Sequence, residues 1–292
     1  MAALRRAKAN LARYKAAVLQ AAVTGRLVAD RPQRSSETSE VSESASDLLA
    51  RILAERRAQW QRANPKKQYV EPKGPDVAGL PGLPVGWVWA TVEQVAEVGT
   101  GATPKRENNL YWAKGTVAWL TSSVVNSEYV AEAEEYITET ALRETNAKIF
   151  PSGTLLVAMY GEGKTRGKVT EMRLDAATNQ ALAALTFHPP ADRIRPFVKL
   201  VLMAGYEAMR RLSSGGVQPN LNLSHIKQTI VPMPPIEEQK RIAFEVDRHL
   251  SVIQATQQVI TANLARAEGL RQGVLGKAFR GELVANGETA EV

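Results

Sequence analysis

The sequence contains no cysteine, few histidines and no long apolar run. The absence of cysteine among 292 residues excludes disulfides and thiolate metal sites and suits a reducing compartment, so we expect a cytoplasmic location. No apolar stretch approaches the roughly eighteen residues that a membrane-spanning helix needs, so we expect no membrane partner. The three histidines, His188, His225 and His249, lack the spacing of metal ligands, so no metal site is predicted.

Sequence patterns of catalysis are also missing. There is no Gly-x-Ser-x-Gly motif and no thiol that could serve as a nucleophile. The acidic run from Glu128 to Glu144 is explained by an exposed edge of a helix or strand. His249 falls in a long helical pattern, where we expect it to be solvated. We therefore predict that this chain has no catalytic residue, binds no cofactor and is not an enzyme.

The net charge of +7 is unevenly distributed. Residues 1–34 hold 8 basic residues and 1 acidic residue, whereas residues 85–236 hold 15 basic and 14 acidic residues. The excess of positive charge therefore lies in the first segment, and the middle of the chain is close to neutral. Contacts with a polyanion in the middle would have to come from local clusters.

The C-terminal part reads as one long helix over residues 236–281, followed by a tail over 282–292. Apolar residues recur there in steps of three and four, which is the pattern of a coiled-coil seam. A helix of this length would reach about 65 Å and cannot bury its own seam, so it needs a partner helix. The seam residues that we select are Val246, Leu250, Ile253, Ile260, Leu264 and Val274.

The N-terminal segment, residues 1–30, is the candidate partner. It carries a similar seam that includes Leu11 and Val18, with Gly25 as its expected stop. The two segments also share sequence, because Ala9-Asn-Leu-Ala-Arg13 recurs as Ala262-Asn-Leu-Ala-Arg266. Chance similarity between alanine-rich helices is the alternative, but the shared string and the shared Gly-x-Leu-Val ending favour a true repeat.

Between the helices we expect a linker and one mixed α/β domain. Residues 31–84 form the linker, with a short helix from about Ser46, which is suited to cap it, to Arg62. Residues 85–235 form the domain, whose strand order the sequence does not reveal. The expected strands lie at 87–89, 117–120, 154–160, 183–187 and 229–231, and the expected helices at 138–148 and 196–211.

One segment of this domain resembles the end of a phosphate-binding loop. Gly161-Glu-Gly-Lys-Thr165 follows an apolar strand, as in loops whose backbone N–H groups and lysine hold phosphates. The first glycine of that pattern is replaced by Ala158. The helix that should follow is replaced by Arg166-Gly-Lys-Val-Thr170, which reads as a turn returning into a strand. An NTPase is therefore an alternative that fits the pattern poorly.

Several loops of the domain fit nucleic-acid contacts better. The segment from 160 to 168 could present three cations at a hairpin tip, and three other loops carry hydroxyls, amides and cations that bond to phosphates or base edges. Each loop alone is more often simply a polar surface turn, and it is their number in one domain that suggests nucleic-acid contacts. The residues that we select are Thr103, Lys105, Arg106, Ser122, Ser123, Tyr160, Lys164, Thr165, Arg166, Lys168, Gln218 and Asn220.

Repeated helices around one α/β domain resemble the specificity subunits of type I restriction–modification systems. The resemblance is carried by Ala9–Val28, Leu83–Arg106 with its Gly-Trp-Val-Trp opening, Gly153–Ala184 and Gly215–Val284. The stretch Pro-Pro-Ile-Glu-Glu-Gln before the long helix belongs to the last of these. The resemblance implies a target-recognition domain that reads one half of a bipartite site in double-stranded DNA, with long helices setting the spacing.

The resemblance also implies partners. Such subunits hold methyltransferase subunits, which use S-adenosylmethionine, and in the restricting complex they recruit nuclease and translocase subunits. This chain departs from the family pattern because it has a single recognition domain. We therefore expect a homodimer joined through the helices, or pairing with a different half-subunit. The alternative of another class is a coiled-coil scaffold with a protein-binding central domain. The DNA sequence read, and the presence of a nuclease subunit, do not follow from the sequence.

Overall fold

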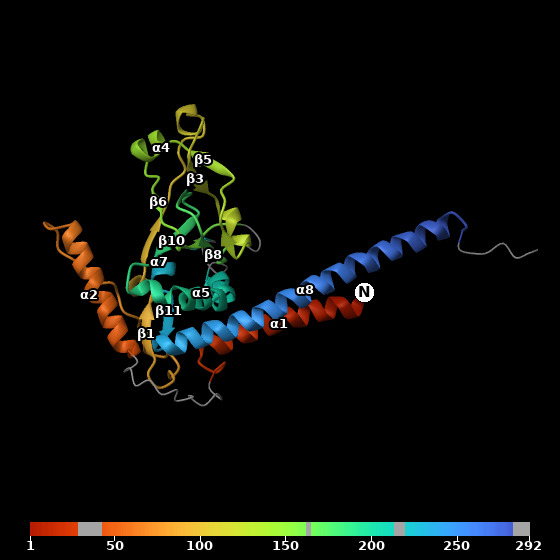
Figure 1. Ribbon diagram of the computed structural model, residues 1–292, viewed down its shortest axis with the longest axis horizontal. Coiled ribbons are helices and arrows are strands. Elements are labelled where there is room, and N and C mark those ends of the chain that lie inside the picture. The colour runs from red at the N-terminus through yellow and green to blue at the C-terminus, as the bar shows by residue number, and fades with distance from the viewer. Residues whose placement is uncertain (29–42, 162–164, 213–219, 283–292) are drawn as a thin grey trace, which may run out of the picture. The chain divides into compact units, whose positions relative to one another are not determined.

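The computed structural model describes residues 1–28, 43–161, 165–212 and 220–282 (Figure 1). Its contacts divide the chain into two units, one of residues 1–18 and 244–292 and the other of residues 19–243. The first is helical and the second mixes helices with short strands, as the sequence predicts. No helix within the described ranges is long and apolar enough to cross a membrane.

The helical unit is built from two helices that run antiparallel. Helix α8 (Ile236–Phe279) has 44 residues and α1 (Ala2–Val23) has 22, which correspond to about 66 and 33 Å. Figure 1 shows α1 alongside the N-terminal part of α8, while the C-terminal part of α8 extends past the N-terminus of the chain. The short helix therefore covers only part of the long one.

Side chains of the two helices meet along the predicted seam. Val18, Val246, Ile253 and Ile260 are buried. Leu11, Leu250 and Leu264 are half-buried, and Val274 is 53% exposed. His249, for which the sequence predicts a solvated position, is half-buried: the Tyr14 hydroxyl lies 2.9 Å from its Nδ1, and the two rings pack edge to face.

The described strands of the mixed unit form three small sheets. The two-stranded sheet pairs β1 (Val88–Thr91) with β11 (Ile230–Met233). The five-stranded sheet has the order β2 (Glu97–Thr100), β10 (Leu182–Thr186), β7 (Leu155–Ala158), β8 (Val169–Met172) and β4 (Tyr129–Val130). The four-stranded sheet has the order β5 (Glu135–Ile137), β3 (Val117–Leu120), β9 (Ala176–Thr178) and β6 (Ile149–Phe150). The pairs β3–β9 and β4–β8 are parallel, and the other pairs are antiparallel.

The five-stranded and four-stranded sheets share one hydrophobic core. Leu156 and Leu182 from the larger sheet pack in the same buried cluster as Leu120 and Phe150 from the smaller one. The residues of β7 and β10 are buried throughout, which explains their continuous apolar runs. The five predicted strands are confirmed as β1, β3, β7, β10 and β11, with shifts of one or two residues at their ends.

Short helices surround these sheets. They are α2 (Ala45–Ala63), α3 (Val92–Val95), α4 (Glu139–Glu144), α5 (Arg195–Ala204), α6 (Tyr206–Leu212), α7 (Leu223–Lys227) and the 3₁₀ turns η1 (Asn109–Tyr111), η2 (Ser122–Asn126) and η3 (Ala191–Ile194). The predicted linker helix is confirmed as α2, although Ser44 caps it in place of Ser46. The helix predicted over 196–211 is divided at Gly205, and the one predicted over 138–148 ends early because Thr145 is extended.

The packing of the seam predicts that substitutions at two neighbouring residues of α8 change the stability of the protein by different amounts. Ile253 is 4% exposed, whereas Val252 is 62% exposed. Ile253→Ala should lower the free energy of unfolding by about 2–4 kcal/mol, because it leaves a cavity beneath α1. Val252→Ala should change it by less than about 0.5 kcal/mol. Urea unfolding followed by far-ultraviolet circular dichroism measures both; equal effects would contradict the packing described here.

Candidate nucleic-acid interface

The turn between β9 and β10 brings several loops of the mixed unit together. The Asn179 backbone N–H donates to the carbonyl of Leu120 at the end of β3, at 2.9 Å. The carbonyl of Ala181 accepts from the N–H of Met159 just after β7, at 2.8 Å. The Thr100 hydroxyl at the end of β2 donates to the carbonyl of Leu182, at 2.9 Å. The segments that follow β2, β3 and β7 therefore all begin beside this turn.

The segment after β2 lies directly against the turn. A Cβ atom added to Gly101 would lie 1.8 Å from the carbonyl oxygen of Thr178, so only glycine permits this approach. The exposed Thr103 donates from its hydroxyl to Oε1 of Gln180, at 2.7 Å. Lys105 is also exposed, and its carbonyl accepts from the Trp112 indole, at 3.1 Å. These contacts fix the loop and leave the Lys105 ammonium group at the surface.

Arg106 is held more tightly than the sequence predicts. Its guanidinium forms an ion pair with Glu135 and lies 3.9 Å from the ring centre of Trp112 and 4.8 Å from that of Trp119. The hydrogen bond to Glu135 raises the pKa of Arg106. The side chain is still 48% exposed. Arg106 is thus held in place by one carboxylate and two indoles. No short sequence pattern predicts this arrangement, because Glu135 lies on β5, far from Arg106 in the sequence.

The segment after β3 is the turn η2. Ser122 is half-buried and Ser123 is exposed, with its hydroxyl 2.8 Å from that of Thr121. Asn126 accepts from the Lys168 ammonium group at 2.7 Å, which joins this segment to the one after β7. A groove of about 260 Å³ runs beside these residues and is also lined by Glu132, Glu134 and Glu135. Its carboxylates disfavour a phosphate there and suit hydrogen-bond donors.

The segment after β7 differs from the expected cationic tip. Tyr160 is 38% exposed, but Thr165, Arg166 and Lys168 are half-buried, and Lys168 is bonded to Asn126. Lys164 lies outside the described residues. From Thr165 the chain turns at Gly167, with φ 83°, and enters β8 at Val169. No helix starts within this described stretch, so the arrangement that a phosphate-binding loop needs is contradicted here.

The segment before α7 completes the set. Asn220 is exposed, and the N–H of the following Leu221 donates to the carbonyl of Met159, at 3.1 Å. Gln218 lies outside the described residues. The structure therefore brings Asn220 close to the segment after β7. That segment in turn contacts the turn at Asn179–Ala181, beside which the segments after β2 and β3 also begin.

A buried ion pair supports β8 on the side of β4. The Lys199 ammonium group on α5 lies 3.3 Å from the Glu171 carboxylate and donates to the Glu128 carbonyl at 3.2 Å. Burial lowers the pKa of Lys199, and the negative charge of Glu171 opposes that change. The Tyr129 ring lies between Arg173 and Lys199, and burial raises the pKa of its hydroxyl. This cluster anchors α5 to two strands and is structural in character.

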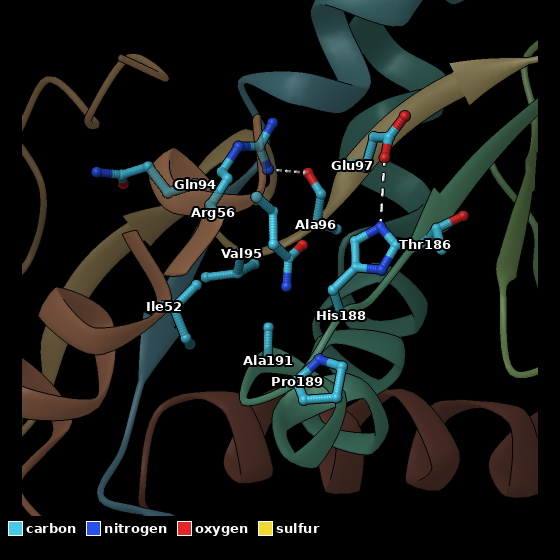
Figure 2. Close-up of a pocket in the computed structure, with 11 residues that line it drawn as sticks. Ile52, Arg56, Gln94, Val95, Ala96, Glu97, Thr186, His188, Pro189 and Ala191 are labelled. Atoms are coloured by element: carbon cyan, nitrogen blue, oxygen red, sulfur yellow. Dashed lines mark hydrogen bonds and ion pairs between the residues drawn. The ribbon is translucent and has the colours of Figure 1, made fainter. Parts of the chain in front are cut away.

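A small cleft lies at the opposite ends of β2 and β10. Figure 2 shows Arg56 pointing at the carbonyl of Ala96 and His188 facing Glu97, at 2.9 and 3.3 Å. The space that it encloses is only about 30 Å³, which suits a water molecule and not a nucleoside. Within the described ranges no three His, Asp or Glu side chains are grouped as metal ligands.

Comparison with known proteins identifies relatives of the chain. The sequence pattern of the "Type I restriction modification DNA specificity domain" matches residues 84–262. The chain is 30% identical over 169 residues to the MjaIX specificity subunit of Methanocaldococcus jannaschii, covering 55% of this chain and 37% of that protein. It is 22% identical over 186 residues to the EcoR124I/EcoR124II specificity subunit of Escherichia coli, covering 63% and 45%. The chain thus spans less than half the length of these relatives.

Solved structures share the fold. A chain from a structural study of assembly and conformational transition in a type I R–M system matches with a TM-score of 0.55 and 20% identity, over 82% of this chain and 58% of that one. The HsdS subunit of Thermoanaerobacter tengcongensis matches with a TM-score of 0.50 and 19% identity, over 82% and 57%. Both similarities support the mixed α/β fold with long helices.

The close approach at Gly101 makes a prediction about the candidate interface. Gly101→Ala should destabilise the protein by about 1–3 kcal/mol, because the methyl group must displace backbone at Thr178. Gly99→Ala is the matched control, because its methyl group would meet the flexible end of Lys148 first. Thermal unfolding followed by tryptophan fluorescence compares the two. A Gly101→Ala variant as stable as Gly99→Ala would contradict the geometry of this loop.

Proposed function

The chain belongs to the type I restriction modification DNA specificity family, and we propose that it reads one half of a bipartite DNA site for a restriction–modification complex. The observation that carries the proposal is that three polar segments begin beside the turn between β9 and β10, with a fourth, before α7, bonded to one of them at Met159. These segments supply hydroxyls, amides and cations from one unit of the chain. Base edges and phosphates are the partners that such a set of groups recognises.

The charges of the domain indicate how such binding would work. Residues 85–236 are nearly neutral, and of the selected cations Arg106 and Lys168 already have partners in the chain. Lys105 is exposed and has no ion pair among the described residues, so it can meet a phosphate, while Thr103, Ser123 and Asn220 offer neutral donors and acceptors at the surface. Phosphate contacts would set the register of the domain, and neutral groups would discriminate bases. Affinity should accordingly fall as the salt concentration rises.

The helical unit supports a dimer. Beyond the part of α8 that α1 covers, Leu270, Val274, Leu275 and Phe279 are 66, 53, 39 and 89% exposed. An apolar seam on a helix requires a second helix, and a second copy of α8 in antiparallel orientation would supply one. Such a dimer would hold two recognition domains related by a two-fold axis. A different half-subunit with a similar helix is the alternative occupant.

The proposal assigns binding to this chain and chemistry to its partners. A methyltransferase subunit would bind S-adenosylmethionine and extrude the target base, because chemistry on a stacked base requires extrusion. Nuclease and translocase subunits would join in a restricting complex, and the assembly would work in the cytoplasm, where the DNA lies. A coiled-coil scaffold that binds protein through its central domain is the competing function, and it predicts no salt-dependent affinity for DNA.

Mapping of methylated bases tests the recognition role. We expect a host that carries the chain and the methyltransferase of its system to show a split, inverted-repeat motif, since identical domains on a two-fold axis read identical half-sites. The motif should disappear when the chain is deleted. A split but asymmetric motif would support a second half-subunit. Unchanged methylation in an active system would contradict the proposal and favour the scaffold.

The dimer is tested by one charge in the exposed seam. Val274→Asp should shift the protein from the mass of two chains to that of one, because a carboxylate cannot be buried between helices without a partner. Val70→Asp is the control, since Val70 is 81% exposed and lies outside the helical unit. Sedimentation or light scattering gives the mass. A wild-type chain that is monomeric across a range of concentrations would exclude the homodimer.

A further inference from the structure

Gln180 lies in the turn beside which the segments after β2, β3 and β7 begin. We propose that its side-chain amide contacts the DNA, donating to a hydrogen-bond acceptor on the duplex. This inference rests on the proposed function, and it adds a residue whose sequence surroundings do not single it out. Gln180 lies in the turn between two apolar strands, a place where a polar residue is ordinary.

The backbone of the turn is fixed from both sides. Upstream, β9 pairs with β3 in the four-stranded sheet, and downstream, β10 pairs with β2 and β7 in the five-stranded sheet. The Asn179 side chain closes the turn by accepting from the Ala181 N–H, at 3.1 Å. Thr178 is fully buried immediately before it. Little freedom is left for the main chain at Gln180, so its side chain starts from a defined position.

The side chain of Gln180 is exposed, and the hydrogen bond found for it involves its oxygen. Its Oε1 accepts from the Thr103 hydroxyl, at 2.7 Å, which holds the amide plane toward the segment after β2. Among the described residues, no hydrogen bond from its Nε2 group is found. An amide carries two N–H donors and an oxygen with two lone pairs. Gln180 therefore presents both donors, and one acceptor position, to a ligand at the surface.

The surrounding charges make a neutral donor useful at this position. Arg106 is paired with Glu135 and Lys168 with Asn126, so these two cations are already occupied. A glutamine amide matches the N6 and N7 edge of adenine in the major groove, and its donors also suit a phosphate oxygen. Both sources share one chemistry, an acceptor on duplex DNA. Comparing cognate with unrelated duplexes separates them.

The test measures DNA affinity and the methylated motif for four variants. Gln180→Ala removes the amide, and Gln180→Glu keeps an acceptor for Thr103 but removes both donors and adds a charge. Thr103→Val removes the internal hydrogen bond together with the Thr103 hydroxyl, which is itself a candidate DNA contact, and leaves the Gln180 amide in place. Gln228→Ala is the matched control, an exposed glutamine of the same unit whose amide donates to Ser224. Thermal unfolding of each variant shows whether it remains folded.

We expect Gln180→Ala to bind its cognate duplex about 5- to 100-fold more weakly, and Gln180→Glu to lose more. A base contact would relax the motif at one position per half-site. A phosphate contact would weaken cognate and unrelated duplexes alike and leave the motif unchanged. Thr103→Val should have a smaller effect than either Gln180 variant, because it leaves the donors in place.

Two results would overturn the inference. One is a Gln180→Glu variant that binds and specifies methylation like Gln228→Ala. The other is a Gln180→Ala variant with the same affinity and the same methylated motif as Gln228→Ala. Failure of the proposed function is a separate outcome, because then the wild-type chain itself would direct no motif.

Discussion

The junction between β9 and β10 is the constraint on which the rest of the mixed unit depends. One short segment must satisfy the hydrogen bonds of two different sheets within a few residues, because unpaired backbone groups are costly in a buried place. Its neighbours are therefore forced close, so closely that Gly101 meets the carbonyl of Thr178. The segments after β2, β3 and β7 leave from this junction together, which is how a domain with short strands gathers a polar surface.

A second constraint shapes the helical unit. Helix α8 is twice as long as α1, so α1 can bury only part of its apolar seam. Burial ends near Leu264, and Leu270 and Phe279 beyond it are exposed. Burying those side chains against another helix of the same kind would stabilise the association of the two helices. The length difference between two related helices thus provides a physical reason for assembly.

Charge is used differently in different parts of the chain. In the mixed unit, carboxylates and amides hold the cations in place, as Glu135 holds Arg106 and Asn126 holds Lys168. Such pairs orient side chains at some cost in attraction for phosphates, a balance that suits a protein that must discriminate sequences. In residues 1–34 the positive charge is concentrated, 8 basic residues against 1 acidic residue.

Periodicity and composition determined much of this protein by themselves: the long helix with its seam, its shorter repeat, the linker helix, and the five apolar strands of one mixed domain. These features depend on local patterns of apolar residues, which favour the same helix or strand whichever surface the apolar face packs against. The sequence also supplied the segments of the candidate interface. Only the tertiary structure decided which side chains are available there, because Glu135, Asn126 and Gln180 reach their partners Arg106, Lys168 and Thr103 across different strands. Pairing between sheets is set by packing over the whole unit, and no spacing in the chain encodes it.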